Sequence, residues 1–90
     1  MISWTESADK WGIPHEDALF AIRNARYDSD NVKLNDGDPD APRRVFIGPQ
    51  HEQTERLVEV LIWLKRGGDF LVYHVMPLGS HYRRQMEDDK

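Results

Sequence analysis

The 90-residue chain contains no cysteine, and this absence removes several classes of chemistry at once. Disulfide frameworks, cysteine-ligated zinc sites and thiol catalysis are all excluded. The chain also lacks an apolar run of the ~20 residues that span a bilayer, so we expect no membrane insertion. Residues 1–6 show no basic segment followed by an apolar one, as an export signal would. We therefore expect a cytoplasmic protein.

The composition is nevertheless that of a folded protein. Hydrophobic residues make up 39% of the chain and charged residues 31%, which argues against wholesale disorder. Ninety residues leave no length for a second core. We therefore treat residues 1–90 as a single domain.

The charge is acidic overall but unevenly distributed. Twelve Lys and Arg against sixteen Asp and Glu give a net charge of −4, which is a poor default for a nucleic-acid binder. Five aspartates lie in residues 28–40 and three further acids in residues 87–90; the rest of the chain holds ten basic and eight acidic residues. The folded body is therefore close to neutral, and a basic patch is neither excluded nor implied.

The first third of the sequence favours helix. Pro14 suits a first helical position, and Glu16 and Asp17 would lie at the positive end of the helix dipole. Apolar positions follow at helical spacing: Ala18, Leu19, Ala21, Ile22 and Ala25. We predict a helix over 14–25 and a shorter helical turn around 6–11. Trp4 and its neighbours are typical of a short strand or an ordered arm.

The remaining sequence predicts strands and one short helix. Residues 28–42 form an acidic loop of strand fragments and turn residues. Three stretches enriched in β-branched and aromatic residues predict strands: 44–47, 57–65 and 70–76. Ser80 is a plausible N-cap for a short C-terminal helix over 80–88. The order predicts an α+β fold, an antiparallel sheet of three to four strands with helices packed on one face.

Alternation along the last two long strands predicts which side chains share a face. Val58, Val60, Ile62 and Leu64 would form an aliphatic side, and Leu57, Glu59, Leu61 and Trp63 a mixed one. In the following strand, we predict two sets of side chains on opposite faces: Leu71, Tyr73 and Val75 on one, and Phe70, Val72, His74 and Met76 on the other. The hairpin register decides whether Glu59 and His74 share the mixed face.

Several short motifs then point to a family. Residues 10–18 read Lys-Trp-Gly-Ile-Pro-His-Glu-Asp-Ala, and Trp4 lies in a candidate first strand. These features resemble the opening motif K-H-G-I-x-x-E-E-A of the BrnT-like toxins, ribonucleases of bacterial type II toxin–antitoxin pairs with a RelE-like fold. Residues 44–48, 57–60, 71–75 and 82–84 resemble that family's later strands and C-terminal helix. The resemblance implies a RelE/BrnT-like fold, an mRNA substrate and a cognate antitoxin.

The chain departs from the family pattern at two places that matter for function. The family usually has an arginine just after the last strand, whereas residues 74–79 contain neither arginine nor lysine. The histidine of the opening motif is replaced by Trp11, although His15 lies four residues on. Catalysis has therefore either moved to other residues or been lost.

RNA cleavage without a metal needs a base, an acid, and cations that stabilise the phosphorane. The segment His81-Tyr82-Arg83-Arg84 holds an imidazole, a phenol and two guanidinium groups within one helical turn. The candidate catalytic residues are His81, His74, Tyr82 and Arg83. The candidate phosphate-binding residues are Arg43, Arg44, Arg84 and Lys65. The competing interpretation is a solvated helix whose arginines pair with Glu87 and Asp88. His74 gains weight only if Glu59 or Arg44 lies beside it, and Trp63 and Phe46 serve either as base-stacking surfaces or as core.

Metal and cofactor sites find little support. Asp36, Asp38 and Asp40 alternate like calcium ligands, but Gly37 is misplaced for an EF-hand and Ile47 stands where the final glutamate would be. The four histidines show no i, i+4 pair, and there is no phosphate-binding glycine loop. We expect neither a metal nor an organic cofactor.

The leading hypothesis is thus a BrnT-like, metal-independent endoribonuclease acting on mRNA and neutralised by an antitoxin protein. The alternative is a non-catalytic protein-interaction module on the same scaffold. Convergence of His81, Arg83, Arg84 and Arg44 would favour the enzyme, and their separation would weaken it.

Overall fold

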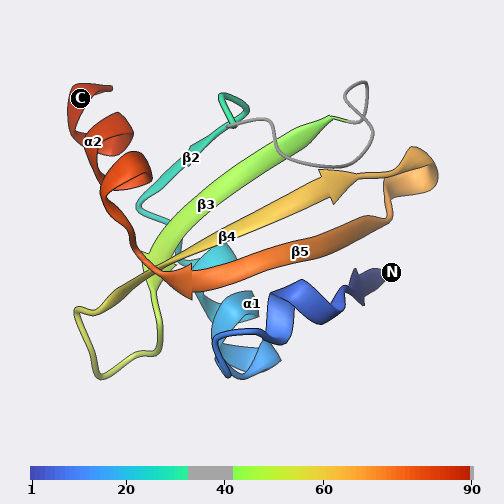
Figure 1. The fold of residues 1–90 in the computed structure, drawn as a ribbon, viewed down its shortest axis with the longest axis horizontal. Helices are drawn as coiled ribbons and strands as arrows, with labels where there is room; N and C mark the ends of the chain where they lie inside the picture. Colours follow the sequence, from blue (N-terminus) through green and yellow to red (C-terminus); the bar gives the residue numbers. More distant parts are fainter. Residues whose placement is uncertain (33–41, 90) are drawn as a thin grey trace.

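The computed structural model describes residues 1–32 and 42–89, which form a small α+β domain around a five-stranded sheet (Figure 1). The elements are β1 (Ile2–Trp4), η1 (Glu6–Asp9), α1 (His15–Arg23), β2 (Tyr27–Ser29), β3 (Arg43–Pro49), β4 (Leu57–Leu64), η2 (Arg66–Gly68), β5 (Phe70–Pro77) and α2 (Ser80–Asp88). In the described part of the chain, neither helix has the length and apolar character needed to cross a membrane.

The sheet is mixed, and this corrects the prediction of an antiparallel sheet of three to four strands. Its order is β1-β5-β4-β3-β2, with β1 parallel to β5 and every other pair antiparallel. The three central strands form the predicted meander. The two outer strands have three residues each, too few for alternation to reveal their pairing partners. The parallel pairing of β1 joins segments nearly 70 residues apart, which no local pattern encodes.

Helices cover both faces of the sheet, so the prediction of helices on one face was wrong. On one face, Ala18 and Ala21 of α1 are fully buried in a cluster with Val58, Val60 and Val72. On the other face, Tyr82 of α2 is buried in a second cluster with Val45, Ile47 and Leu61. The mixed face of β4 therefore still carries enough apolar surface to need a cover, and α2 provides it.

The first helix is shorter than predicted and lies very close to the sheet. It runs over His15–Arg23 rather than 14–25, with Pro14 at the N-cap position. The Asn24 side chain donates to the Phe20 carbonyl at 2.9 Å where the helix ends. A Cβ at Gly48 of β3 would overlap the carbonyl oxygen of Ala21. The absence of a side chain at Gly48 is what lets α1 and β3 approach this closely.

A β-bulge in β5 decides which side chains reach the α2 face. Leu61 pairs with His74, but the next residue, Ile62, pairs with Val72, so Tyr73 is an extra residue in β5. Tyr73 and His74 consequently both lie on the mixed face, and Val75 lies with Val72 on the α1 side. The predicted alternation holds along β4 but fails in β5, because alternation assumes an uninterrupted ladder.

The acidic loop predicted over 28–42 begins with a strand, since Tyr27–Ser29 form β2. Residues 33–41 lie outside the described residues, and with them the aspartates considered as calcium ligands, Asp36, Asp38 and Asp40.

Candidate functional site

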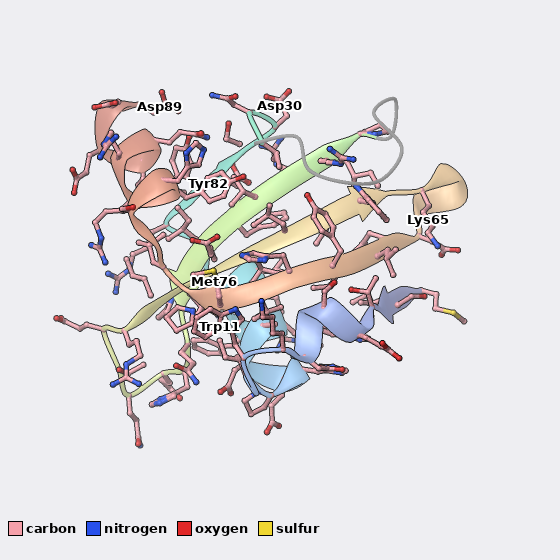
Figure 2. The ribbon with its side chains drawn as sticks, viewed as in Figure 1. Trp11, Asp30, Lys65, Met76, Tyr82 and Asp89 are labelled. Carbon is pink, nitrogen blue, oxygen red and sulfur yellow. The ribbon has the colours of Figure 1, made fainter. Side chains whose placement is uncertain are left out.

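A shallow pocket of about 250 Å³ opens where the C-terminal helix meets the sheet. It is built from the first half of β4, the second half of β5 and the start of α2. Its lining residues are Glu59, Leu61, His74, Met76, Gly79, Ser80, His81 and Tyr82. In Figure 2, Met76 and Tyr82 mark this end of the sheet, and Lys65 lies at the opposite end. Both predicted histidines, His74 and His81, therefore line one space.

Glu59 is the buried polar centre of the pocket. Its side chain is only 5% exposed, and its Oε2 lies 3.0 Å from Nε2 of His74, which is 32% exposed. Its other oxygen, Oε1, accepts the backbone N–H of Gly79 at 2.8 Å. The bulge in β5 is what aligns His74 with Leu61 and so brings its ring onto the face of Glu59. The condition that would strengthen His74 as a functional residue is thus met through Glu59.

His81 and Tyr82 enter the pocket from α2 in different roles. The Tyr82 side chain is buried against the β3–β4 core, so it forms a fixed wall and anchors the helix to the sheet. His81 is exposed at the first turn of α2, and its ring meets the Tyr82 ring edge-on, with centroids 4.6 Å apart. The helix therefore holds one imidazole at the solvent-facing side of the pocket.

The arginines of α2 lie on the helix surface rather than in the pocket. Arg83 and Arg84 are exposed, and neither is among the residues that line the His74 pocket. Arg84 and His81 instead share a neighbouring hollow with Asn31, Gln85 and two aspartates of the C-terminal segment. Arg84 is therefore close to one pocket histidine, whereas Arg83 remains a surface cation.

The three remaining basic candidates lie elsewhere in the fold. Arg44 pairs with Ile62 on the α1 face of the sheet, opposite to α2, and donates to Asp28 at 3.1 Å. Arg43 is buried, 7% exposed, with its guanidinium 5.4 Å from the centre of the Trp63 ring. Lys65 follows β4 at the end of the sheet far from α2 (Figure 2). The convergence of His81, Arg83, Arg84 and Arg44 that would favour an enzyme therefore does not occur.

The aromatic candidates for base stacking are already packed. Trp63 stacks on Tyr73 with centroids 4.8 Å apart, and Arg43 lies over the Trp63 ring. Phe46 packs against the α1-side core, on the face opposite the pocket. Burial raises the pKa of Tyr73 to about 12, although the nearby charge of Arg43 opposes part of the rise. These rings serve the stability of the sheet.

Sequence reasoning found the two histidines and considered Glu59 as a possible neighbour of His74, but it did not include Gly79 and Ser80 among the site residues. Glu59 carried a usable signal, because it is the one charged residue in the eight-residue apolar strand Leu57–Leu64. A buried carboxylate without a partner is costly, so a polar partner across the sheet was to be expected. Gly79 and Ser80 had no such signal, since both residue types are common at helix starts. Ser80, predicted as the N-cap, is the first residue of α2, and Gly79 occupies the N-cap position.

The arrangement brings together groups that can transfer protons. Within the described residues, no three His, Asp or Glu side chains are grouped so that they could hold a metal ion. Two imidazoles, one of them hydrogen-bonded to a buried carboxylate, border a pocket that water and a ligand can enter. Such a set can take up a proton at one point and deliver one at another.

Comparison of the chain with protein families, with curated proteins and with solved structures finds no match.

Proposed function

We propose that this protein is a metal-independent endoribonuclease whose site is the pocket between β4, β5 and α2. The observation that carries the proposal is that His74 and His81, from a strand and a helix, line the same open pocket. RNA can be cleaved without a metal because its own 2′-hydroxyl attacks the adjacent phosphate. That reaction needs one group to accept a proton and another to donate one, and histidine serves both purposes near neutral pH.

The reaction needs two proton transfers, one at the attacking 2′-oxygen and one at the departing 5′-oxygen. One imidazole accepts the 2′-hydroxyl proton as the oxygen bonds to phosphorus, and the other protonates the departing 5′-oxygen, which leaves a 2′,3′-cyclic phosphate. Arg84, which lines a neighbouring hollow together with His81, would supply a cation for the phosphate charge. A volume of about 250 Å³ would hold the phosphate and its sugar while the rest of the strand lies across the surface.

The biological setting follows from the BrnT-like resemblance of the sequence. On this proposal the protein is a toxin that cleaves mRNA and is neutralised by a cognate antitoxin protein. The departures from the family pattern agree with a displaced site, since the pocket uses His74 and His81 instead of an arginine after the last strand. An antitoxin that covers the start of α2 would also cover the pocket, which Ser80 and His81 line.

The direct test is cleavage of a fluorescent single-stranded RNA in the presence of EDTA. We expect His74→Asn and His81→Asn each to slow cleavage by about 10²–10⁴-fold, because each removes one proton-transfer group. The matched control is His51→Asn, since His51 is exposed in the β3–β4 loop and is not among the residues that line the pocket. A substrate with a single 2′-deoxy sugar at the cleavage position should be resistant. Cleavage that survives both pocket substitutions would overturn the proposal.

The second candidate function is a non-catalytic protein-interaction module. The separation of Arg43, Arg44 and Lys65 from the pocket favours it, because an RNA-cleaving surface would be expected to gather cations. Controlled expression distinguishes the two functions. Growth arrest with fragmented mRNA, relieved by His74→Asn, supports the ribonuclease; normal growth with intact RNA supports the module.

A further inference from the structure

We propose that Glu59 is the positioning residue of this pocket: its carboxylate fixes the tautomer of His74, so that Nδ1 accepts the proton of the substrate. This inference rests on the proposed ribonuclease function and assigns roles within the same site. It names His74 as the general base and leaves His81 as the general acid.

The first step is the hydrogen bond between the carboxylate and the ring. On this proposal Glu59 is ionised; because a carboxylate then has no proton to give, His74 Nε2 donates to Glu59 Oε2 across the 3.0 Å contact. A neutral imidazole carries only one N–H, and placing it on Nε2 leaves the lone pair on Nδ1. Nδ1 is therefore the nitrogen of His74 that can accept a proton from a ligand.

The second step is the link from the same carboxylate to α2. Glu59 Oε1 accepts the N–H of Gly79, the residue that precedes the helix, at 2.8 Å. A Cβ at Gly79 would lie only 3.4 Å from that oxygen, so the chain turns into α2 directly against the carboxylate. His81 follows two residues later. One buried carboxylate thus sets the ring of His74 and the start of the element that carries His81.

The third step assigns the proton transfers. The 2′-O–H bond breaks, its proton passes to Nδ1 of His74, and the oxygen forms its bond to phosphorus. The phosphorus–5′-oxygen bond breaks, and the proton of the His81 imidazolium goes to the departing oxygen. The enzyme is left with His74 protonated and His81 neutral, and proton exchange with water restores the starting state. The acid role falls to His81 because it is the second imidazole that lines the pocket.

Glu59→Gln tests the assignment because an amide reverses the hydrogen-bond pattern. If the amide oxygen keeps the Gly79 N–H, its NH₂ group faces His74, whose Nε2 must then accept, so the ring hydrogen moves to Nδ1. Nitrogen-15 NMR of the histidine side chains distinguishes the two neutral tautomers. We expect the Nε2–H form of His74 in the wild type, the Nδ1–H form in Glu59→Gln, and cleavage reduced by about 10²–10⁴-fold.

The control is Glu55→Gln, which removes the same charge from an exposed position just before β4 and should change neither tautomer nor rate. An Nδ1–H tautomer of His74 in the wild type would overturn the inference even if RNA is cleaved, and this measurement needs no variant to fold. Unchanged cleavage by a folded Glu59→Gln would also overturn it. A wild type that leaves RNA intact while His74 shows the Nε2–H form would instead remove the proposed ribonuclease and, with it, the base assignment.

Discussion

Tyr73 shows how one extra residue in a strand acquires an unusual environment. The bulge places its ring on the same face as the ring of His74, stacked on Trp63, and burial there raises its pKa to about 12. An unfolded tyrosine titrates near pH 10, with a pKa of about 10. Between about pH 10 and 12 the unfolded chain therefore loses a proton that the folded protein keeps.

The free energy of unfolding should consequently fall as the pH rises from about 10 to about 12, and the contribution should be constant below that window. Urea unfolding of the wild type and Tyr73→Phe across this range isolates the effect, because phenylalanine keeps the stacking ring but cannot ionise. The difference in stability between the two proteins should change with pH only above about pH 10. An equally steep alkaline loss in Tyr73→Phe would assign the effect to other groups.

The site residues differ in how readily the sequence alone could identify them. His74 and His81 could be selected because few residue types transfer protons near neutral pH. The contact of His74 with Glu59 in the pocket that His81 also lines could not be predicted, because it depends on the register between β4 and β5 and on the bulge at Tyr73. Arg44 was selected from the sequence as a phosphate-binding candidate, but its pairing with Ile62 places it on the α1 face of the sheet, opposite the pocket.

Among the elements, α1 and β3 approach each other closely. Gly48 has no side chain where one would overlap the backbone of Ala21. We expect Gly48→Ala to lower the free energy of unfolding by about 1–3 kcal/mol, because either the helix or the strand must move to admit the methyl group. Chemical denaturation followed by circular dichroism measures the loss.

Gly79→Ala is the control for that substitution. Its new Cβ would lie 3.4 Å from Glu59 Oε1 and 3.5 Å from Met76 Cε, both ordinary contacts, so the loss of stability should be smaller. A Gly48→Ala protein as stable as the wild type would show that α1 shifts without penalty.

The helices and strands differ in how well the sequence pattern predicted them. The three long strands and α1 were predictable because each contains enough residues for a period of two or of 3.6 to emerge. The face covered by α2 was not, because only Tyr82 and Met86 of this largely polar helix pack against the cluster of Val45, Ile47 and Leu61. Two apolar side chains are too few for periodicity to reveal an orientation.

The whole molecule consists of two cores that share one sheet. Its radius of gyration is 12.3 Å, close to the roughly 12 Å expected for a compact chain of this length. The strands that separate the cores are common to both, so neither core can lose its packing without disturbing the other. We therefore expect the domain to unfold in a single cooperative transition.

Matched substitutions on the two faces test this. Ile62→Val alters the α1-side core and Ile47→Val the α2-side core, and each should lower the free energy of unfolding by about 0.5–1.5 kcal/mol. In both variants the denaturation midpoints from circular dichroism and from tryptophan fluorescence should coincide, because Trp4 and Trp63 report on opposite faces. A transition that splits into two steps in either variant would show that the cores unfold separately.

The arrangement of the N-terminal segment along β5 has a consequence for how copies of the protein behave when crowded. β1 pairs with β5 only as far as Trp4 and Val72, and a bare strand edge beyond that point would be a template for sheet-to-sheet aggregation. Instead, the Thr5 N–H donates to the Val72 carbonyl at 3.0 Å, and the Ser7 hydroxyl donates to the Tyr73 carbonyl at 2.9 Å. The 3-10 turn thus occupies the edge where the strand pairing stops, and a neighbouring chain finds those acceptors already taken.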